Sequence, residues 1–298
     1  MNIFSRIVAV FALASGLAGC ISAPIPLTSA ATAHLREQAP VRFLLTFDDG
    51  PSASGFYNPT ERVLEGLANN AVQLGIKALF FVQTGATGAG NSDQGRALMQ
   101  REHAEGHLLG LHSATPHHTN HRSLSDEELD QSLTQGGDIL DSITGSTVLV
   151  RPPFWNYDKR TFAAYQRHGL HVLLTDISAN DGKIWGWNMS LRRRAHFLRE
   201  LSQVRERIVA GELPTVDGAI PVVVTFHDLN RYTARHIEEY LQILVDSARQ
   251  NGLVLAARPF YENTATLERA ALARTVKTAD EPVHLPGIWN WIWDHNSH

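Results

Sequence analysis

The sequence predicts an α/β protein built on a parallel sheet. Short apolar runs typical of buried strands alternate along the chain with longer stretches whose apolar residues have helical spacing. Such alternation places helices over a mostly parallel sheet, which is either doubly wound or closed into a barrel. With 298 residues, of which 43% are hydrophobic, the chain is long enough to bury the core that this fold needs.

The expected elements follow one another from residue 41 onward. Strands are predicted at 41–47, 76–82, 108–111, 147–150, 171–175, 221–226 and 253–257. Helices are predicted at 60–74, 94–104, 125–143, 159–168, 192–210 and 234–251. Ser125 begins the third helix as its N-cap, because Glu128 stands at the third position after it, as in a capping box.

The first residues have the pattern of an export signal. Arg6 supplies a positive charge, and the apolar run at 7–19 is too short to span a bilayer as a stable helix. The run ends in the sequence LAGC, which resembles the lipobox of bacterial lipoproteins, where the cysteine is lipidated. We therefore expect a lipoprotein signal peptide at 1–19 and a lipidated Cys20; an ordinary cleaved signal with an incidental cysteine is the alternative.

The segment at 20–40 is rich in alanine, serine, threonine and proline, so we interpret it as a tether. The expected location is a bacterial membrane outside the cytoplasm, namely the periplasmic face of the outer membrane in a two-membrane bacterium. Cys20 is the only cysteine, which excludes a disulfide within one chain. A net charge of -4 without a long basic run gives no reason to expect nucleic acid as a partner.

Reactive side chains stand directly after five of the predicted strands. In chain order they are Asp48 with Asp49, His112, Arg151, Asp176 and His227. Active sites of parallel sheets and barrels form at the carboxyl ends of their strands, so these side chains are expected to converge on one face.

Five motifs in sequence order resemble those of the NodB-type polysaccharide deacetylases, which are family 4 of the carbohydrate esterases. They read TFDDGP at 46–51, KALFFV at 77–82, GHLLGLHS at 106–113, RPPF at 151–154 and VTFHD at 224–228. The resemblance implies a distorted (β/α) barrel with fewer than eight strands and a divalent metal held by one aspartate and two histidines. It places the deacetylase domain at 41–260 and leaves 261–298 as a C-terminal extension.

The adjacent aspartates suit a divided role. Two neighbouring carboxylates on a Gly-Pro turn point in different directions, so one can bind a cation while the other reaches a water on that cation. The resemblance makes Asp49 the metal ligand and Asp48 the general base, with Arg151 beside Asp48 to favour its ionised form. A polar surface turn and a structural ion pair are the plainer interpretations of these residues.

The histidine ligands are less certain because the sequence departs from the family. His112 matches the first ligand, but the second is usual four residues later, where this chain has Pro116. An insertion of one residue would bring His117 to the metal, and His118 and His121 are the alternatives. His103 and His107 form a rival pair with i, i+4 spacing, which we interpret as the end of a helix.

The fourth motif also differs, with two widely spaced aspartates and no adjacent tryptophan. The resemblance makes His227 the general acid; we expect Asp181 to orient it, with Asp176 as the alternative. Trp185 or Trp187 are candidates for the missing aromatic wall, and the backbone N–H of Phe154 for the oxyanion donor. The remaining tryptophans of interest, in the C-terminal tail, are expected to cover the barrel; they are Trp289, Trp291 and Trp293.

Together these features predict a metal-dependent hydrolase that removes N- or O-acetyl groups from a carbohydrate polymer containing N-acetylglucosamine. Mixed nitrogen and oxygen ligands favour Zn²⁺ as the cofactor. Two other functions stay open. The ligand set also suits a non-haem iron oxygenase, although those enzymes need no Asp48 or Arg151, and the two altered motifs are compatible with a non-catalytic glycan-binding lipoprotein.

Overall fold

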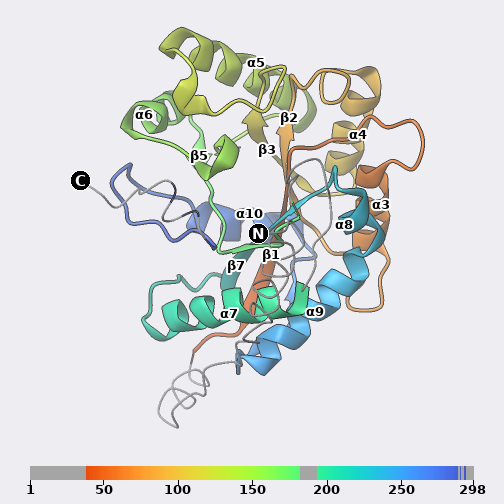
Figure 1. Ribbon diagram of the computed structural model, residues 1–298, viewed down its shortest axis with the longest axis vertical. Coiled ribbons are helices and arrows are strands. Elements are labelled where there is room, and N and C mark those ends of the chain that lie inside the picture. The colour runs from red at the N-terminus through yellow and green to blue at the C-terminus, as the bar shows by residue number, and fades with distance from the viewer. Residues whose placement is uncertain (1–37, 182–192, 288, 290–291, 293–298) are drawn as a thin grey trace, which may run out of the picture.

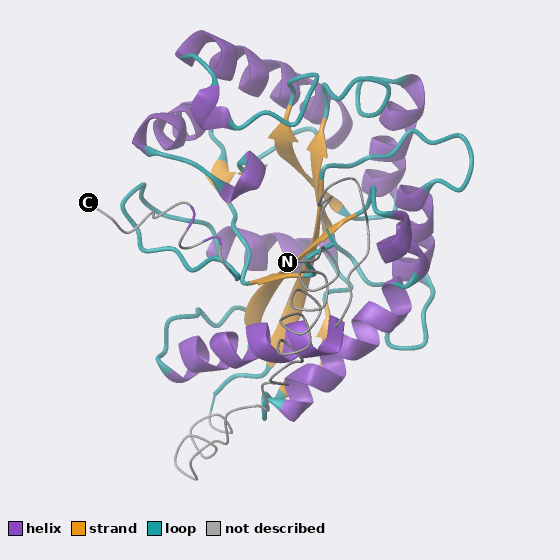
Figure 2. Ribbon diagram, in the orientation of Figure 1, coloured by secondary structure: helices purple, strands orange, loops and turns teal. Residues whose placement is uncertain are grey.

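Eight parallel strands form the centre of the molecule, and helices surround them (Figures 1 and 2). The computed structural model describes residues 38–181 and 193–287, together with Trp289 and Ile292. The strands are β1 (Val41–Asp48), β2 (Leu79–Gln83), β3 (Leu108–Ser113), β4 (Leu149–Val150), β5 (His171–Val172), β6 (Ile177–Ser178), β7 (Ile220–His227) and β8 (Leu255–Phe260).

The helices lie around the outside of the sheet, as Figure 2 shows. They are α3 (Pro59–Ala68), α4 (Asp93–Ala104), α5 (Asp126–Thr144), α6 (Lys159–Arg167), α7 (Arg193–Val209), α8 (Arg231–Arg235), α9 (Ile237–Gln250) and α10 (Thr264–Ala273). Two short 3₁₀ helices are η2 (His121–Ser123) and η3 (Pro153–Trp155). None of the helices in the described ranges is long and apolar enough to cross a membrane.

The sheet is the distorted barrel that the sequence predicted, but it has eight strands where fewer than eight were expected. Seven strands pair in the order β5-β4-β3-β2-β1-β7-β6, and β8 joins off this path by pairing with β1 near Val41 and Phe43. β5 and β6 end the path and do not pair with each other within the described residues. The C-terminal segment covers the edge of β5, where the backbone N–H of Val276 donates to the carbonyl of Val172 at 2.9 Å.

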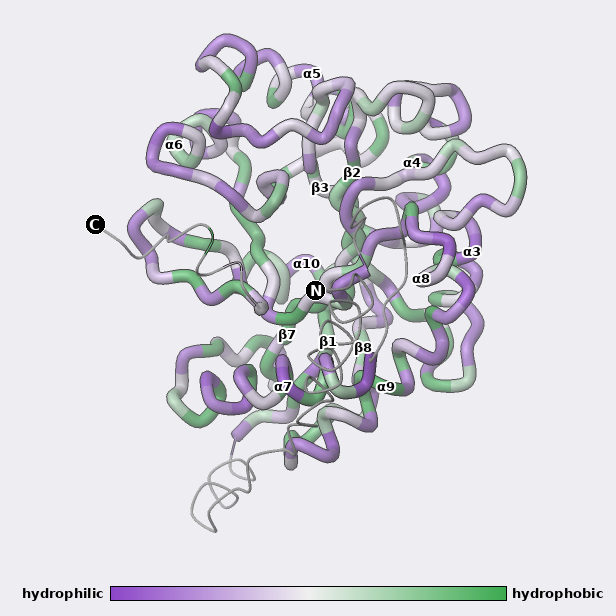
Figure 3. Tube along the Cα trace, viewed as in Figure 1, coloured by the Kyte–Doolittle hydropathy of each residue, from purple (hydrophilic) through white to green (hydrophobic). Residues whose placement is uncertain are grey.

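Alternation along β1 divides the apolar core into two clusters. Phe43 and Phe47 belong to the larger cluster, between the sheet and the surrounding helices, whereas Leu44 belongs to a smaller one. Leu267 of α10 joins this smaller cluster, so the segment after residue 260 supplies part of the core. Figure 3 shows apolar residues concentrated along the central strands and polar residues along the outer helices.

Several elements differ from the prediction for local reasons. The first helix ends at Ala68 instead of residue 74, because the Asn70 side chain accepts from the backbone N–H groups of Val72 and Gln73 and forms a turn. β6 and α10 were not predicted from the sequence. The segment predicted to be a signal peptide lies outside the described residues, as do Cys20, Trp185, Trp187, Trp291 and Trp293.

The position of Leu267 predicts that the C-terminal segment stabilises the barrel. Leu267→Ala should lower the free energy of unfolding by about 2–5 kcal/mol, because it opens a cavity in the smaller cluster. Leu74→Ala is a matched control, since that leucine is 64% exposed and its loss should cost about 0.5 kcal/mol or less. Chemical denaturation measures both; equal effects would show that α10 is not part of the core.

Candidate active site

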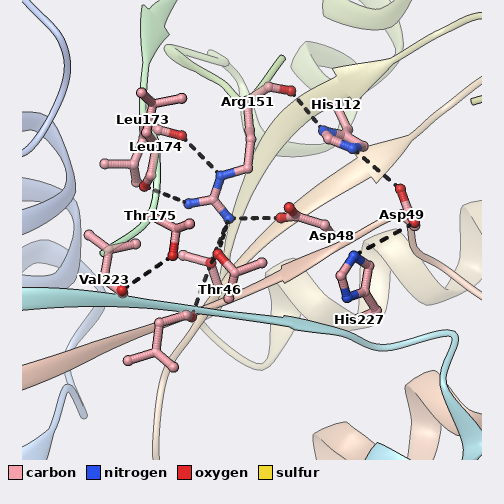
Figure 4. Close-up of polar contacts among 12 residues, drawn as sticks. Thr46, Asp48, Asp49, His112, Arg151, Leu173, Leu174, Thr175, Val223 and His227 are labelled. Carbon is pink, nitrogen blue, oxygen red and sulfur yellow. Dashed lines mark hydrogen bonds and ion pairs between the residues drawn. The ribbon is translucent and has the colours of Figure 1, made fainter. Parts of the chain in front are cut away.

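The reactive side chains gather at the carboxyl ends of neighbouring strands, as Figure 4 shows. β1 and β7 pair in a register that sets Asp48 directly opposite His227. β3 supplies His112 near its own end. Strand pairing therefore brings together residues that are far apart in the sequence, and Asp48, Asp49, His112 and His227 line a single cavity of about 370 Å³.

Arg151 lies fully buried beneath this cavity and holds Asp48. Its Nη1 donates to Asp48 Oδ1 at 2.8 Å, and its guanidinium lies 4.3 Å from the ring centroid of Phe81. The other acceptors are the hydroxyls of Thr46 and Thr225 and the carbonyls of Leu173 and Leu174. Burial lowers the pKa of Arg151, and the Asp48 carboxylate opposes that effect. The pair is placed as the sequence predicted.

Asp49 leaves the strand in a left-handed conformation, with φ of 73°. This turn directs its carboxylate away from Asp48 and into the cavity, where Gln83 Nε2 donates to Oδ1 at 2.9 Å. Gly50 follows because a Cβ there would lie 2.3 Å from the Asp228 carboxylate, which accepts a hydrogen bond from Thr60. Gln83 and Asp228 thus shape the turn, and neither was among the site residues predicted from the sequence.

Asp49, His112 and His118 form a group that can hold a metal ion. Nε2 of His112 lies 3.3 Å from Asp49 Oδ1 and 3.2 Å from Nε2 of His118, which is 3.5 Å from the same oxygen. A tetrahedral ion with bonds of about 2.0–2.1 Å separates its ligands by roughly 3.3–3.4 Å, so the spacing fits zinc.

The tautomer of His112 supports the same conclusion. Its Nδ1 lies 2.7 Å from the carbonyl oxygen of Arg151, which can only accept, so Nδ1 carries the proton. Nε2 then turns a lone pair toward the Asp49 carboxylate, an arrangement that is favourable only with a cation between them, either a proton or a metal ion. Burial lowers the pKa of His118 to about 4, although Asp49 opposes this, so His118 is neutral at pH 7 as a ligand must be.

The prediction of His117 as a ligand is wrong in geometry, because His118 occupies the expected point. The hydroxyl of Thr115 donates to the carbonyl of His117 at 2.6 Å and turns the loop, so His117 is exposed. The next side chain then faces the cavity, and Phe154 stacks on the His118 ring at a centroid distance of 4.3 Å. His118 stands six residues after His112, whereas the family pattern has the second ligand four residues after the first. The loop through Pro116 is therefore two residues longer than that pattern, and one residue longer than predicted.

The remaining histidine candidates lie elsewhere. Nδ1 of His121 is hydrogen-bonded to the hydroxyl of Tyr165, and burial lowers the pKa of His121 to about 3. His107 accepts from the backbone N–H of Ala78, at the start of β3. His103 ends α4, as the helix interpretation of this pair predicted.

His227 is held by Asp181 on the opposite side of the cavity. Nδ1 of His227 lies 2.8 Å from Asp181 Oδ1, and the Thr233 hydroxyl donates to the other carboxylate oxygen at 2.5 Å. Burial lowers the pKa of His227, but Asp181 raises it more, to about 10, so the imidazole is protonated at neutral pH. Asp176 is bound instead by Arg207 and Arg274, so only Asp181 reaches His227.

Aromatic side chains form one wall of the cavity. They come from two segments, Phe154 and Trp155 of η3 and Trp289 of the C-terminal tail. Trp155 and Trp289 meet edge to face with centroids 5.6 Å apart. Trp289 thus lines the cavity as well as covering the barrel. Its contact with Trp155 could not be predicted, because the two residues are far apart in the sequence. The arrangement offers a cation site, a carboxylate and a protonated imidazole around one apolar-walled pocket.

Comparison with known proteins gives a consistent result. Residues 36–173 match the sequence pattern of the family described as polysaccharide deacetylase. The peptidoglycan-N-acetylglucosamine deacetylase PgdA of Listeria monocytogenes is 28% identical over 201 residues, which are 67% of this chain and 35% of that protein. The peptidoglycan-N-acetylglucosamine deacetylase of Bacillus cereus is 31% identical over 52% of this chain and 51% of its own length.

Solved structures share the fold. The chitin deacetylase of Colletotrichum lindemuthianum aligns with a TM-score of 0.53 and 22% identity, covering 74% of this chain and 87% of that one. This likeness concerns the fold alone. The chain spans about a third of the length of the Listeria relative, so the activity of that whole protein is not transferred by the match.

The loop geometry predicts which histidine binds metal. His118→Ala should abolish stoichiometric zinc binding, because it removes one of three ligands, whereas His117→Ala should retain it. Metal content of the purified variants after dialysis against zinc measures the difference. Loss of zinc in His117→Ala with retention in His118→Ala would reverse the assignment.

Proposed function

We propose that the chain is a member of the polysaccharide deacetylase family, whose sequence pattern residues 36–173 match, and that it is a metal-dependent hydrolase that removes acetyl groups from a carbohydrate polymer containing N-acetylglucosamine. The observation that carries the proposal is the convergence of the Asp49, His112 and His118 ligand atoms between Asp48 and His227. The names of the similar bacterial proteins support N-acetylglucosamine as the acetylated sugar.

The cation site supplies electrophilic chemistry. A divalent ion such as Zn²⁺ would be held by Asp49, His112 and His118, where it would polarise a carbonyl and lower the pKa of a water. The chain's own residues then manage the protons. Asp48 accepts the proton of the attacking water, and Arg151 orients that carboxylate through the 2.8 Å hydrogen bond.

His227 serves as the proton donor on the other side of the pocket. An amide nitrogen is too poor a leaving group to depart as an anion, so it must receive a proton as the bond to the acetyl carbon breaks. Nδ1 of His227 is engaged with Asp181, which leaves Nε2 facing the cavity, 3.9 Å from Asp49 Oδ2. Nε2 is therefore the atom that delivers the proton to the sugar nitrogen or oxygen.

The pocket wall suits a small acyl group on a sugar. Trp155 and Trp289 present apolar surface beside the polar residues, which favours the acetyl methyl group and the face of a sugar ring. A non-catalytic glycan-binding role requires less than this site offers, because binding alone uses neither the Arg151–Asp48 pair nor the Asp181–His227 pair.

The division of labour between the two aspartates yields a direct test. Asp48→Asn should retain zinc and lose roughly 10²- to 10⁴-fold in acetate release from N-acetylglucosamine oligomers, because the proton acceptor is removed. Asp49→Ala should lose the metal itself. Acetate release and zinc content are measured on the same samples. Equal loss of metal in both variants would refute the separate roles.

We also propose that Cys20 is acylated and anchors the protein to a membrane, in the outer membrane of a two-membrane bacterium, because LAGC follows an apolar run. Wild-type protein should then partition into detergent, and Cys20→Ala should accumulate either uncleaved or released from membranes. Membrane fractionation with mass spectrometry of the N-terminus measures this. Recovery of wild-type protein entirely as a soluble periplasmic species would contradict the anchor.

A further inference from the structure

An exposed patch of aromatic and arginine side chains lies next to the candidate active site. It combines the loop between β1 and α3 with α3 and α8, which Figure 1 shows side by side. We define this arginine patch by five residues, which are Phe56, Tyr57, Arg62, Arg231 and Arg235. The function proposed above uses none of them.

The aromatic part of the patch is held open to solvent. Phe56 is 77% exposed and Tyr57 is 53% exposed, and their rings meet edge to face at a centroid distance of 5.1 Å. Tyr57 has a φ of 53°, in the left-handed region that an aromatic residue rarely adopts. Neighbouring apolar side chains in strained, exposed positions are typical of binding surfaces.

The arginines surround the tyrosine. The guanidinium carbons of Arg62 and Arg235 lie 5.5 and 5.9 Å from the centroid of the Tyr57 ring. Arg231 donates to the hydroxyl of Ser54, in the same loop, at 3.2 Å. All three arginines are exposed, and all three line one small surface depression beside Tyr57.

These arginines have no acidic partners within the described part of the chain. None of them forms an ion pair, although most other arginines on the surrounding helices do; Glu239 of α9, for example, pairs with Arg193. The whole chain carries a net charge of -4, so a group of three arginines that form no ion pair runs against its overall balance. Such a group attracts a negatively charged ligand.

The patch is continuous with the cavity. Leu229 and Asn230 line the cavity, and Arg231 follows them directly in the chain. The loop that carries Phe56 and Tyr57 begins at the turn after Asp49, which is itself part of the cavity wall. A polymer with one sugar in the cavity therefore passes over this patch when it leaves on the α8 side.

We propose that the arginine patch binds a carboxylate-bearing stretch of the glycan whose acetyl group lies in the cavity. This inference rests on the proposed function and names the chemical class of its substrate. Arginine side chains bind carboxylates through paired hydrogen bonds, and the exposed rings offer a stacking surface for sugars. A neutral polymer would leave the three positive charges without a partner, so the patch selects an acidic glycan.

Matched substrates separate charge from shape. One is a set of peptide-free peptidoglycan glycan strands, whose lactyl groups carry a carboxylate on every second sugar; the other is the same strands with those carboxylates methyl-esterified. Arg231→Gln/Arg235→Gln removes two charges from the patch, and Arg167→Gln/Arg258→Gln removes two from exposed positions on α6 and β8. Acetate release gives kcat and KM, and fluorescence anisotropy of labelled strands gives Kd without turnover.

The patch variant should raise KM and Kd for the acidic strands by about fivefold, the size of a weak surface contact, with kcat unchanged. Its values for the esterified strands, and all values for the control variant, should match wild type. Phe56→Ser should weaken both substrates to the same degree, because stacking does not depend on the carboxylate.

Two results would overturn the inference: wild-type protein that binds both strands equally, or a patch variant that weakens both equally. Absence of acetate release from wild-type protein would instead count against the proposed function. The anisotropy measurement would still test whether the arginine patch binds acidic strands, because it needs no turnover.

Discussion

The buried guanidinium of Arg151 is the interaction on which the site depends. A charge in a barrel interior is tolerated only when it is paired and fully hydrogen-bonded. Arg151 meets this requirement with Asp48, two threonine hydroxyls and the carbonyls of Leu173 and Leu174. These partners come from β1, β7 and the link between β5 and β6, so one side chain joins the centre of the sheet to the two ends of the strand path.

The same residue also acts through its backbone. The carbonyl of Arg151 accepts from Nδ1 of His112 and thereby presents Nε2 to the cation site, while its side chain orients Asp48. The proposed base, Asp48, and one candidate metal ligand, His112, are thus positioned by a single residue at the end of β4. Asp181 has the equivalent place for the proposed acid, His227, since it binds both the backbone N–H and the imidazole of that residue. Strand ends fix the groups proposed to react, whereas loops and the C-terminal tail supply the aromatic wall of the cavity.

Features of the site that depend on local sequence patterns could be predicted, whereas those that depend on contacts between distant segments of the chain could not. The strand ends at Asp48, His112, Arg151 and His227 could be predicted, because alternation locates the strands and parallel pairing collects their carboxyl ends. The choice between His117 and His118 could not, because it depends on the Thr115 hydroxyl and on stacking against Phe154 from another loop.

Longer-range contacts were beyond the sequence patterns. Asp176 directly follows a predicted strand, as the candidate catalytic residues do. In the structure, however, its carboxylate forms ion pairs with Arg207 of α7 and with Arg274, which follows α10. Trp289 reaches the cavity because the tail packs against the barrel, a contact that no local pattern reveals.

The central claim is that a metal ion at Asp49, His112 and His118 enables acetyl removal from an acetylated glycan. The most direct measurement is acetate release by the purified protein before chelation, after removal of all metal, and after restoration of stoichiometric zinc, with circular dichroism to verify that the fold is kept. We expect activity that disappears with the metal and returns with it. Undiminished acetate release by folded, metal-free protein would contradict it.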